Sequence, residues 1–328
     1  MGEFDIIRHY FQRKRVDRAD ILQSVGDDCA ITRLEPHQQL AITTDTLVEG
    51  THFLPTISPE DLAYKSVAVN LSDVAAMGAK PVWVSLALTL PKIDHHWLEK
   101  FSDGLFEILD RYHVALIGGD TTKGDRLSIT ITAHGILAEH TGLFRHQAKV
   151  GDLIFVSGTL GDSAAGLALL LNPTKTELNH AQQALLQRHL RPTPRVELGQ
   201  ALNGISRCAI DISDGLLADL GHILTRSQVG AALNLEQLPL SQNLQQIYPL
   251  VAAQQLALTG GENYELCFTV APDKVTALNR VLAPLDVPCH CIGKIIEAEK
   301  GLVLLQQGQI VPPPTQAGFD HFLDEHDE

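Results

Sequence analysis

The chain has 328 residues, 45% of them apolar, and a formal net charge of −14 at neutral pH. This length suits two domains better than one and allows a sizeable core, while the negative charge disfavours a protein that binds nucleic acid. The charged N-terminus lacks the apolar run of a secretory signal, and no apolar stretch approaches the length of a membrane helix, so we expect a cytoplasmic protein with no membrane partner.

The first half of the chain alternates predicted helices and strands. Apolar residues at helical spacing predict an amphipathic helix over residues 3–13. A second helix is predicted over 59–78, with Ser58 as its cap, Pro59 in its first turn and Gly78 at its end. The other expected elements are strands over 40–46, 82–90, 114–118 and 127–137 and a helix over 96–112.

The second half of the chain is expected to form a separate domain. We place the boundary near residues 149–152, which gives domains of 1–148 and 149–328. Ser213 is predicted to cap a helix that begins near Leu216. The other expected elements are a strand over 153–157, a helix over 162–171, an extended segment over 190–195 and a strand over 264–270 that follows a Gly-Gly-Glu turn. Helices and strands mixed in both halves predict two α/β or α+β domains.

The segment from Gly158 to Gly161 allows two interpretations. Its glycines suggest a phosphate-binding loop, but it lacks a lysine and matches no Walker motif. A tight turn between a strand and a helix is the favoured interpretation.

The five cysteines favour a reducing compartment. They are odd in number and scattered, and no Cys-x-x-Cys pair occurs. Buried free thiols are therefore expected. Cys289 and Cys291 flank His290 and could bind a soft metal, although the alternation of a strand favours ordinary packing.

Five short acidic motifs recur along the chain, and four of them end an apolar or small-residue run. They are Gly26-Asp27-Asp28, Thr43-Thr44-Asp45, Leu71-Ser72-Asp73, Gly118-Gly119-Asp120 and Asp211-Ile212-Ser213-Asp214. Each motif alone is more simply a turn or a helix cap. If the carboxylates converge they need protons or cations, because two unit charges about 5 Å apart repel by roughly 3 kcal/mol at an effective dielectric constant near 20. Hard oxygen ligands suit Mg²⁺, which usually binds together with phosphates, so the set predicts a magnesium and nucleotide site.

The common phosphate-binding and hydrolase motifs are absent from the sequence. Neither G-x-x-x-x-G-K-[ST] nor G-x-G-x-x-G occurs, and H-E-x-x-H and G-x-S-x-G are missing as well. A nucleotide enzyme with this sequence would hold its phosphates chiefly through Mg²⁺, assisted by isolated basic residues such as Lys123 and Arg145.

Taken in order, the motifs resemble those of the thiamine-monophosphate kinases, a family of the aminoimidazole-ribonucleotide synthetase-like superfamily. The matching segments, which include the acidic motifs, are 2–4, 26–30, 43–46, 52–54, 70–78, 118–122, 158–166, 189–195, 211–216, 260–266 and 318–322. They cover nearly the whole chain, and an ordered set of this length is highly specific.

The resemblance implies an activity and a fold. The family uses ATP and Mg²⁺ to phosphorylate thiamine monophosphate to thiamine diphosphate, the final step of thiamine diphosphate biosynthesis, by direct in-line transfer. Such transfer needs positioning and charge neutralisation more than a protein nucleophile. The implied fold is α/β (α+β), with an N-terminal domain whose sheet forms a barrel across a homodimer interface and a C-terminal α/β domain that completes the active site.

The resemblance also implies residue roles, carried over by matching position. The implied metal ligands are Asp28, Thr43, Thr44, Asp45, Asp73, Asp120, Asp211 and Asp214. The implied nucleotide contacts are Gly119, Asp120, Arg145 and Ser213, and the implied catalytic residues are Asp45, Asp120 and Asp214. The implied contacts to thiamine phosphate are His52, Glu262 and Phe319. Taken singly, these three are more simply a packing histidine, a turn residue and a core anchor.

Two departures and several alternatives stay open. Asn263 stands where the family usually has Asp, and Phe319 replaces a frequent Tyr. A selenide-activating relative would want a reactive Cys near the N-terminus, but the first is Cys29, and a hydrogenase-maturation relative would end in a Cys-bearing tail, which this chain lacks. A purine-pathway ligase shares the implied fold. A non-catalytic protein that binds metal or thiamine phosphate is the rival of another class.

Overall fold

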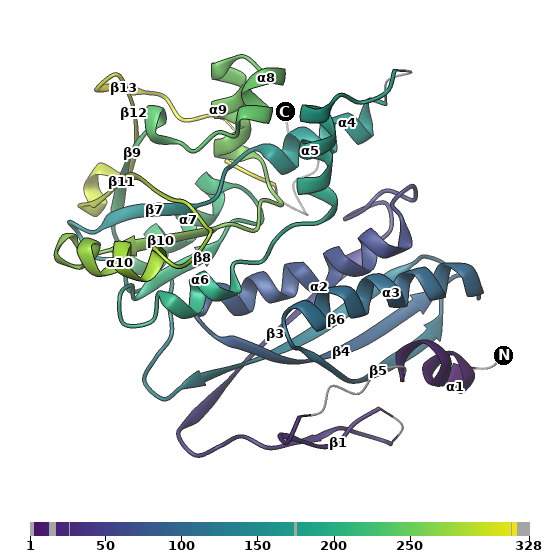
Figure 1. Cartoon of the computed structure of the whole chain (residues 1–328). Helices are drawn as coiled ribbons and strands as arrows, with labels where there is room; N and C mark the ends of the chain where they lie inside the picture. The colour runs from purple at the N-terminus through teal and green to yellow at the C-terminus, as the bar shows by residue number, and fades with distance from the viewer. Residues whose placement is uncertain (1–2, 13–17, 26, 174–175, 316, 320–328) are drawn as a thin grey trace. The chain divides into compact units, whose positions relative to one another are not determined.

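The computed structural model describes residues 3–319, except 13–17, 26, 174–175 and 316 (Figure 1). Gly2, Gly26 and residues 320–322, which belong to the motifs above, lie outside the described residues, as does Arg13 of the first predicted helix. The chain divides into two compact units: Met1–Ala75 with Ala79–Thr141, and Ala76–Gly78 with Gly142–Glu328. In the described part of the chain, no helix combines the length and the apolar character that crossing a bilayer requires.

The first unit is built on a four-stranded sheet in the order β3-β6-β4-β5. Only the β4 and β5 pair is parallel. Two long helices, α2 and α3, lie along one face of this sheet (Figure 1). The bounds are β3 Gln38–Val48, α2 Pro59–Ala76, β4 Lys80–Leu90, α3 His95–Arg111, β5 Ala115–Lys123 and β6 Ser128–Ala138. A short hairpin of β1 (Ile21–Gln23) and β2 (Ile31–Thr32) completes the unit.

The predicted limits of the second helix are confirmed to within two residues. Ser58 Oγ accepts a hydrogen bond from the Asp61 N–H at 3.1 Å, and Pro59 is the first residue of α2. Gly78 follows the helix with φ of +72°, the left-handed conformation in which glycine often ends a helix.

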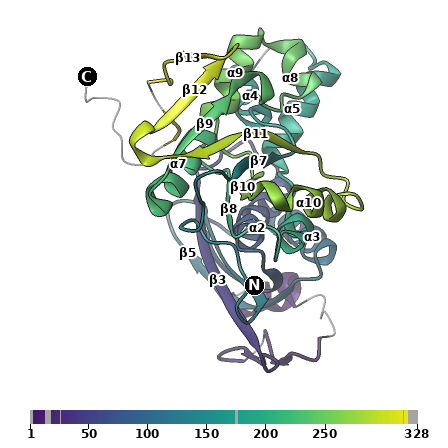
Figure 2. The ribbon, with the colours of Figure 1, turned by 90° about the vertical axis from the view of Figure 1, so that its left-hand side faces the viewer.

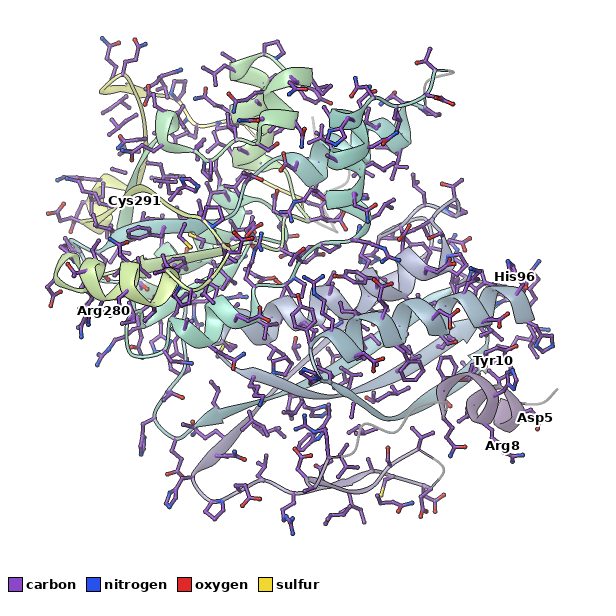
Figure 3. The ribbon with its side chains drawn as sticks, viewed as in Figure 1. Asp5, Arg8, Tyr10, His96, Arg280 and Cys291 are labelled. Atoms are coloured by element: carbon purple, nitrogen blue, oxygen red, sulfur yellow. The ribbon has the colours of Figure 1, made fainter. Side chains whose placement is uncertain are left out.

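The N-terminal helix is amphipathic as predicted, but it changes pitch. It begins as an α-helix, α1 (Glu3–Ile6), and continues as a π-helical segment, η1 (Ile7–Phe11). Figure 3 labels Asp5, Arg8 and Tyr10 on this segment, with Tyr10 close to His96 at the start of α3. Tyr10 is buried, and its hydroxyl lies 2.9 Å from Nδ1 of His95.

Two acidic motifs lie inside strands: Thr43-Thr44-Asp45 as predicted, and Gly118-Gly119-Asp120 in place of the expected position after a strand. The strand expected to stop at Gly118 continues to Lys123, because β5 pairs with β4 along its whole length. Asp120 stands opposite Ala87 in that pairing, and Asp45 stands opposite Ile131 within β3 and β6. Both carboxylates are therefore carried on regular strands rather than on loops.

The second unit contains a seven-stranded sheet in the order β13-β12-β9-β11-β7-β10-β8. All neighbours are antiparallel except β12 and β9. The strands are β7 Leu153–Ser157, β8 Cys208–Asp211, β9 Gly230–Asn234, β10 Leu266–Val270, β11 Cys289–Ile296, β12 Leu302–Gln306 and β13 Gln309–Val311. The predicted strand 153–157 is confirmed to the residue.

Helices cover both faces of the seven-stranded sheet. Figure 2 shows α7 on one side of it and α10 on the other. The helices are α4 Asp162–Leu171, α5 His180–Leu190, α6 Val196–Ala201, α7 Leu216–Ser227, α8 Gln242–Ile247, α9 Leu250–Thr259 and α10 Val275–Leu282. Short 3₁₀ turns are η2 Leu235–Gln237, η3 Pro272–Lys274 and η4 Ala298–Lys300. The predicted helix 162–171 is confirmed.

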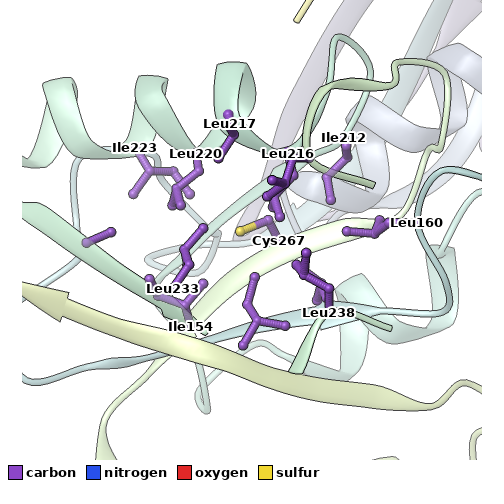
Figure 4. Close-up of a cluster of buried hydrophobic side chains, with 14 of the residues drawn as sticks. Ile154, Leu160, Ile212, Leu216, Leu217, Leu220, Ile223, Leu233, Leu238 and Cys267 are labelled. Atoms are coloured by element: carbon purple, nitrogen blue, oxygen red, sulfur yellow. The ribbon is translucent and has the colours of Figure 1, made fainter. Parts of the chain in front are cut away.

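Apolar side chains form a core on each face of this sheet. Under α7, a buried cluster includes Leu216, Leu220 and Ile223 from the helix and Leu233 and Cys267 from the strands (Figure 4). On the opposite face Phe155 and Phe268 stack with ring centroids 5.6 Å apart. The apolar residues of α7, which are three or four positions apart, are therefore core residues, as expected for one face of an amphipathic helix.

The cysteines match the expectation of buried free thiols only in part. All five are free, but only Cys208 and Cys267 are buried, whereas Cys289 and Cys291 are partly buried and Cys29 is exposed. Burial raises the pKa of the Cys208 thiol to about 12. Cys289 and Cys291 share one side of β11 with His290 on the other, so the alternation of a strand explains this triplet.

Candidate functional site

In the first unit, strand β3 and helix α2 bring two of the acidic motifs together. Thr43 and Asp45 share one side of β3 because side chains alternate along a strand. Thr43 Oγ1 donates to Asp73 Oδ2 at 2.5 Å, and the Asp45 N–H donates to Asn70 Oδ1 at 3.1 Å. Asn70 is fully buried and in turn donates to the Ser66 carbonyl at 2.9 Å. These contacts fix the carboxylate-bearing strand against the helix.

The side chain of Thr44 lies on the opposite side of β3. Its Oγ1 is 2.9 Å from Oγ1 of Thr132 on β6, and the same pairing recurs between Thr46 and Thr130 at 2.9 Å. Among the implied metal ligands, Thr44 therefore faces away from Asp45.

A cavity of about 520 Å³ in the first unit brings two further motifs together. Asp27 and Asp28 line it from the segment after β1, and Asp120 lines it from β5. Its other walls are largely apolar and include Phe11 and Ile117. An apolar cavity with a few convergent polar groups is typical of ligand-binding sites.

Gly119 is required at this cavity by the packing of β5 on β4. Its φ is +152°, and a Cβ at this position would lie 1.8 Å from the Leu86 carbonyl oxygen. Glycine alone fits at this position.

His52 lies in the turn that follows β3. Its Nδ1 accepts a hydrogen bond from the Val48 N–H at 3.1 Å, and its own backbone N–H donates to the Val48 carbonyl at 3.0 Å. Because Nδ1 is the acceptor, the proton of the neutral ring is on Nε2, which can donate to a ligand.

In the second unit, the last acidic motif lies beside the Gly-Gly-Glu turn. Backbone hydrogen bonds join them: the N–H groups of Tyr264 and Glu262 donate to the carbonyls of Ile212 and Ser213 at 2.8 and 2.6 Å. Asp211, at the end of β8, is buried. Two segments that are about 50 residues apart in the sequence thus form one surface.

The C-terminal segment joins the same surface. The Phe319 N–H donates to the Asp214 carbonyl at 3.1 Å, and Gly318 lies so close that a Cβ would be 2.5 Å from that oxygen. The Phe319 side chain is 53% exposed. A side chain this exposed does not serve as a core anchor.

Asp219 caps α7 and organises the loop that carries Ser213 and Asp214. Its Oδ2 accepts three backbone N–H groups, from Ser213, Asp214 and Gly215, each at 3.1 Å. The prediction that Ser213 caps this helix is therefore wrong, because Gly215 precedes the first helical residue and makes no side-chain cap. Burial, and then the charge of Asp214, raise the pKa of Asp219 to about 7. The sequence contains one signal for this contact, because Asp219 is an acidic residue in the first turn of the predicted helix.

Asn263 holds the Gly-Gly-Glu turn to the loop before α4. It is 2% exposed; its Oδ1 accepts from the Gly161 N–H at 2.9 Å, and its Nδ2 donates to the Gly260 carbonyl at 2.7 Å. Both ends of the amide are used, so the neutral side chain has a structural role at this position.

The segment from Gly158 to Gly161 is a turn between a strand and a helix, as favoured. The N–H groups of Gly158 and Leu160 donate to the carbonyls of Pro288 and Pro239 at 2.8 and 2.9 Å. With the Gly161 N–H bound to Asn263, these amides already have partners within the protein.

A buried ion cluster surrounds Glu265, and no single motif of the sequence predicts it. Glu265 is fully buried and accepts from Arg188 at 2.7 Å, from Arg195 Nε at 2.6 Å and from Ser157 Oγ at 2.6 Å. Gly158, with φ of +58°, leaves room for this carboxylate, since a Cβ would lie 2.2 Å from it. A buried carboxylate with this many charged donors is well compensated.

Arg145 is on the surface of the second unit, where its carbonyl accepts from Ser227 Oγ at 2.8 Å. Among the described residues, no group of three or more His, Cys, Asp or Glu side chains is arranged to hold a metal ion.

Comparisons of sequence and of structure with known proteins indicate one family. Residues 26–137 match the family model described as AIR synthase related protein, N-terminal domain, and residues 149–305 match the corresponding C-terminal domain. A thiamine-monophosphate kinase of Haemophilus influenzae is 56% identical over 324 residues, 98% of each chain. The crystal structure of thiamine-monophosphate kinase from Stenotrophomonas maltophilia is 43% identical, with a TM-score of 0.84, and covers 94% of this chain and 96% of that one. The structure of AaThiL complexed with AMPPCP and TMP is 34% identical, with a TM-score of 0.76, over 97% of this chain and 96% of that one.

Replacing Asn263 should destabilise the protein. In Asn263→Ala the buried Gly161 N–H and Gly260 carbonyl lose their partners, which we expect to lower the free energy of unfolding by about 3 kcal/mol. Asn263→Asp keeps an oxygen that accepts from the Gly161 N–H, so it should lower the free energy of unfolding by less. The measurement is denaturant unfolding, with Asn172→Ala as control, since the exposed Asn172 amide also bonds a carbonyl, at 3.1 Å. Equal effects of the two alanine variants would contradict the structural role.

The raised pKa of Asp219 should make the stability of the metal-free protein depend on pH. A carboxyl that binds its proton more tightly in the folded state loses its stabilising effect as pH rises from the unfolded pKa of about 4 to the folded value of about 7. This loss amounts to about 4 kcal/mol. Asp219→Asn should remove this loss of stability. The unfolding free energy of the variant should therefore rise relative to that of the wild type between pH 4 and 7. The control is Asp286→Asn, which removes an exposed carboxyl. The same pH dependence in both variants, or none in Asp219→Asn, would disprove the shift.

Proposed function

The chain belongs to the AIR synthase related family and, within it, to the thiamine-monophosphate kinases, and from that premise we propose which of its residues bind the metal and the substrates. It phosphorylates thiamine monophosphate with ATP to give thiamine diphosphate, the final step of thiamine diphosphate biosynthesis. The observation that carries this function is 56% identity over 98% of the chain.

We propose Mg²⁺ as the cofactor. The candidate donors are carboxylate and hydroxyl oxygens, which are the ligands that Mg²⁺ prefers. Two pairs of these residues support the proposal: Asp28 and Asp120 line one cavity, and the Thr43 hydroxyl contacts the Asp73 carboxylate. The proposed ligands are Asp28, Thr43, Asp45, Asp73 and Asp120 in the first unit and Asp211 and Asp214 in the second. The Thr44 hydroxyl is left out of the proposal, because it pairs with Thr132 on the other side of β3. When bound, Mg²⁺ would offset the charge of the carboxylates and of the phosphates.

The protein's own contribution to the transfer is positioning. Gly119 lines the same cavity as Asp120, which supports a contact between this part of β5 and a phosphate. Arg145 offers an exposed guanidinium, and Ser213 lies in the loop that Asp219 holds. We assign these residues to the nucleotide. With Asp45, Asp120 and Asp214 as catalytic residues, the arrangement supports direct in-line transfer, which depends on geometry and charge.

Three residues suit the chemistry of thiamine monophosphate. His52 presents an Nε2–H, a donor for the phosphate. We assign the Glu262 carboxylate to the substrate's thiazolium cation. The exposed Phe319 ring would offer a face to the same cation, an interaction of about 0.5 to 2 kcal/mol.

A homodimer is proposed from the uncovered face of the four-stranded sheet. On the side of β3 away from α2, Leu40 and Ile42 are 39% and 61% exposed. Leu22 and Ile31 of the hairpin are exposed as well, at 57% and 52%. Exposed apolar residues on a sheet face support an interface, and pairing with a second copy would close the sheet into a barrel.

The compartment and the domain limits are also proposals. Five free cysteines support a reducing cytoplasm. The two family-model matches, which end at residue 137 and begin at residue 149, support functional domains of 1–148 and 149–328.

The carboxylate assignments can be tested by neutralising single charges. Asp45→Asn and Asp120→Asn should each lower kcat by at least about a hundredfold, because an amide cannot replace a charged metal ligand, while the melting temperature stays within a few degrees. The assay follows ADP and thiamine diphosphate together, with and without a chelator. Asp103→Asn on the outer side of α3 is the control. Near-normal turnover in both variants would reject the assignment.

The proposed interface can be tested with a charge on the sheet face. Ile42→Asp should convert a dimer to a monomer in sedimentation velocity, because a buried unpaired carboxylate opposes association. Ile93→Asp is the matched control, since Ile93 is 49% exposed but lies in the connection between β4 and α3. A monomeric wild-type protein, or a dimer that tolerates Ile42→Asp, would contradict the proposal.

A further inference from the structure

His189 is a buried histidine next to the carboxylate of Glu262, which is proposed to contact the substrate. Its side chain, on the last turn of α5, is 5% exposed, whereas that of Glu262 is 27% exposed. Nδ1 of His189 lies 3.1 Å from Ser163 Oγ and 3.3 Å from Oε2 of Glu262. The three side chains come from α5, α4 and the Gly-Gly-Glu turn.

Close packing of α4 against α5 explains why these groups meet. A Cβ on Gly166 would lie 2.3 Å from the Leu185 carbonyl oxygen and 2.9 Å from Cβ of His189, so glycine is needed for this approach. Ser163 is one turn before Gly166 on α4 and therefore faces the same helix. Gly260 packs on α4 as well, since its Cβ would lie 2.6 Å from Cβ of Ala164.

The backbone of Glu262 is held as firmly as its side chain. Its φ is +57°, an uncommon value for a residue other than glycine, and its N–H donates to the Ser213 carbonyl at 2.6 Å. Asn263 then fixes the turn from the following position. Such over-determined geometry is typical of residues that must present a group in one orientation.

Electrostatics favour a proton on Nδ1 of His189. With the proton there, one N–H faces both the Glu262 carboxylate and the Ser163 hydroxyl. Without it, a ring lone pair would face a carboxylate oxygen at 3.3 Å. The protonated nitrogen therefore acts as the donor that orients Glu262.

We infer that His189 and Ser163 are positioning residues that orient the Glu262 carboxylate for the cationic ring of thiamine monophosphate. The inference rests on the proposed substrate role of Glu262. His189 itself touches Glu262, so its effect on the substrate passes through that carboxylate. It should therefore change affinity for thiamine monophosphate and not for ATP.

A double-mutant cycle between His189 and Glu262 tests the inference. The variants are His189→Leu, Glu262→Gln and their combination, with equilibrium binding of thiamine monophosphate by calorimetry, KM for both substrates and the melting temperature as measurements. His189→Leu should weaken thiamine monophosphate binding about tenfold, the usual size for loss of a hydrogen bond to a charged group, and leave KM for ATP within about twofold. In the Glu262→Gln background it should add nothing.

Two milder variants keep the test decisive where His189→Leu folds poorly. His189→Asn places an amide N–H near the position of Nδ1 and should restore most of the affinity. Ser163→Ala should weaken thiamine monophosphate binding by about twofold to threefold, because only the shared hydroxyl is lost.

The possible failures are distinguishable. Unchanged affinity in Glu262→Gln would reject the substrate role of Glu262, and the inference with it. Weaker binding in Glu262→Gln but not in His189→Leu would reject only the positioning role. Additive effects in the double variant, or equal losses for ATP and thiamine monophosphate, would show that His189 acts on the fold alone.

Discussion

Holding carboxylates in fixed positions is the constraint on which the rest of this structure depends. The chain has a net charge of −14, and its acidic motifs lie on strands and tight loops that packing holds in place. Neutral groups hold several of them: the Thr43 hydroxyl donates to Asp73, and the buried Asn70 amide accepts from the Asp45 backbone. A neutral donor orients a carboxylate for a cation, and phosphoryl transfer depends on cations to offset the charge of the phosphates.

The second unit solves a related problem, which is how to hold an acidic loop in one conformation. Asp219 collects three N–H groups of that loop, although its burial next to Asp214 raises its pKa to about 7. Asn263 ties the neighbouring turn with both ends of its amide. The buried Glu265 is balanced by Arg188 and Arg195, so its charge stabilises the scaffold. Rigid polar scaffolding of this kind places substrate-binding groups without contributing chemistry itself.

The sequence predicts the parts of the fold that local chemistry determines. The strand 153–157, the helix 162–171 and the cap at Ser58 follow from periodicity and capping residues, which act over a few positions. The cap of α7 was mispredicted because the choice between Ser213 and Asp219 depends on where Gly215 turns the chain. The partners of Asn263 and His189 lie far away in the sequence, and only the packing at Gly166 and Gly260 brings them together. Candidate site residues were accessible from the sequence through the ordered motifs, whereas the residues that position them were not.

The central claim is that these carboxylates bind divalent cations together with the nucleotide. The most direct measurement is an equilibrium titration of Mn²⁺ into metal-free protein, with and without a non-hydrolysable ATP analogue. We expect protein and analogue together to bind more Mn²⁺ than the sum of the amounts that the two bind separately. The Kd for Mn²⁺ should also be lower than that of either one alone, and Asp45→Asn should remove both effects. Binding that equals this sum would contradict the account.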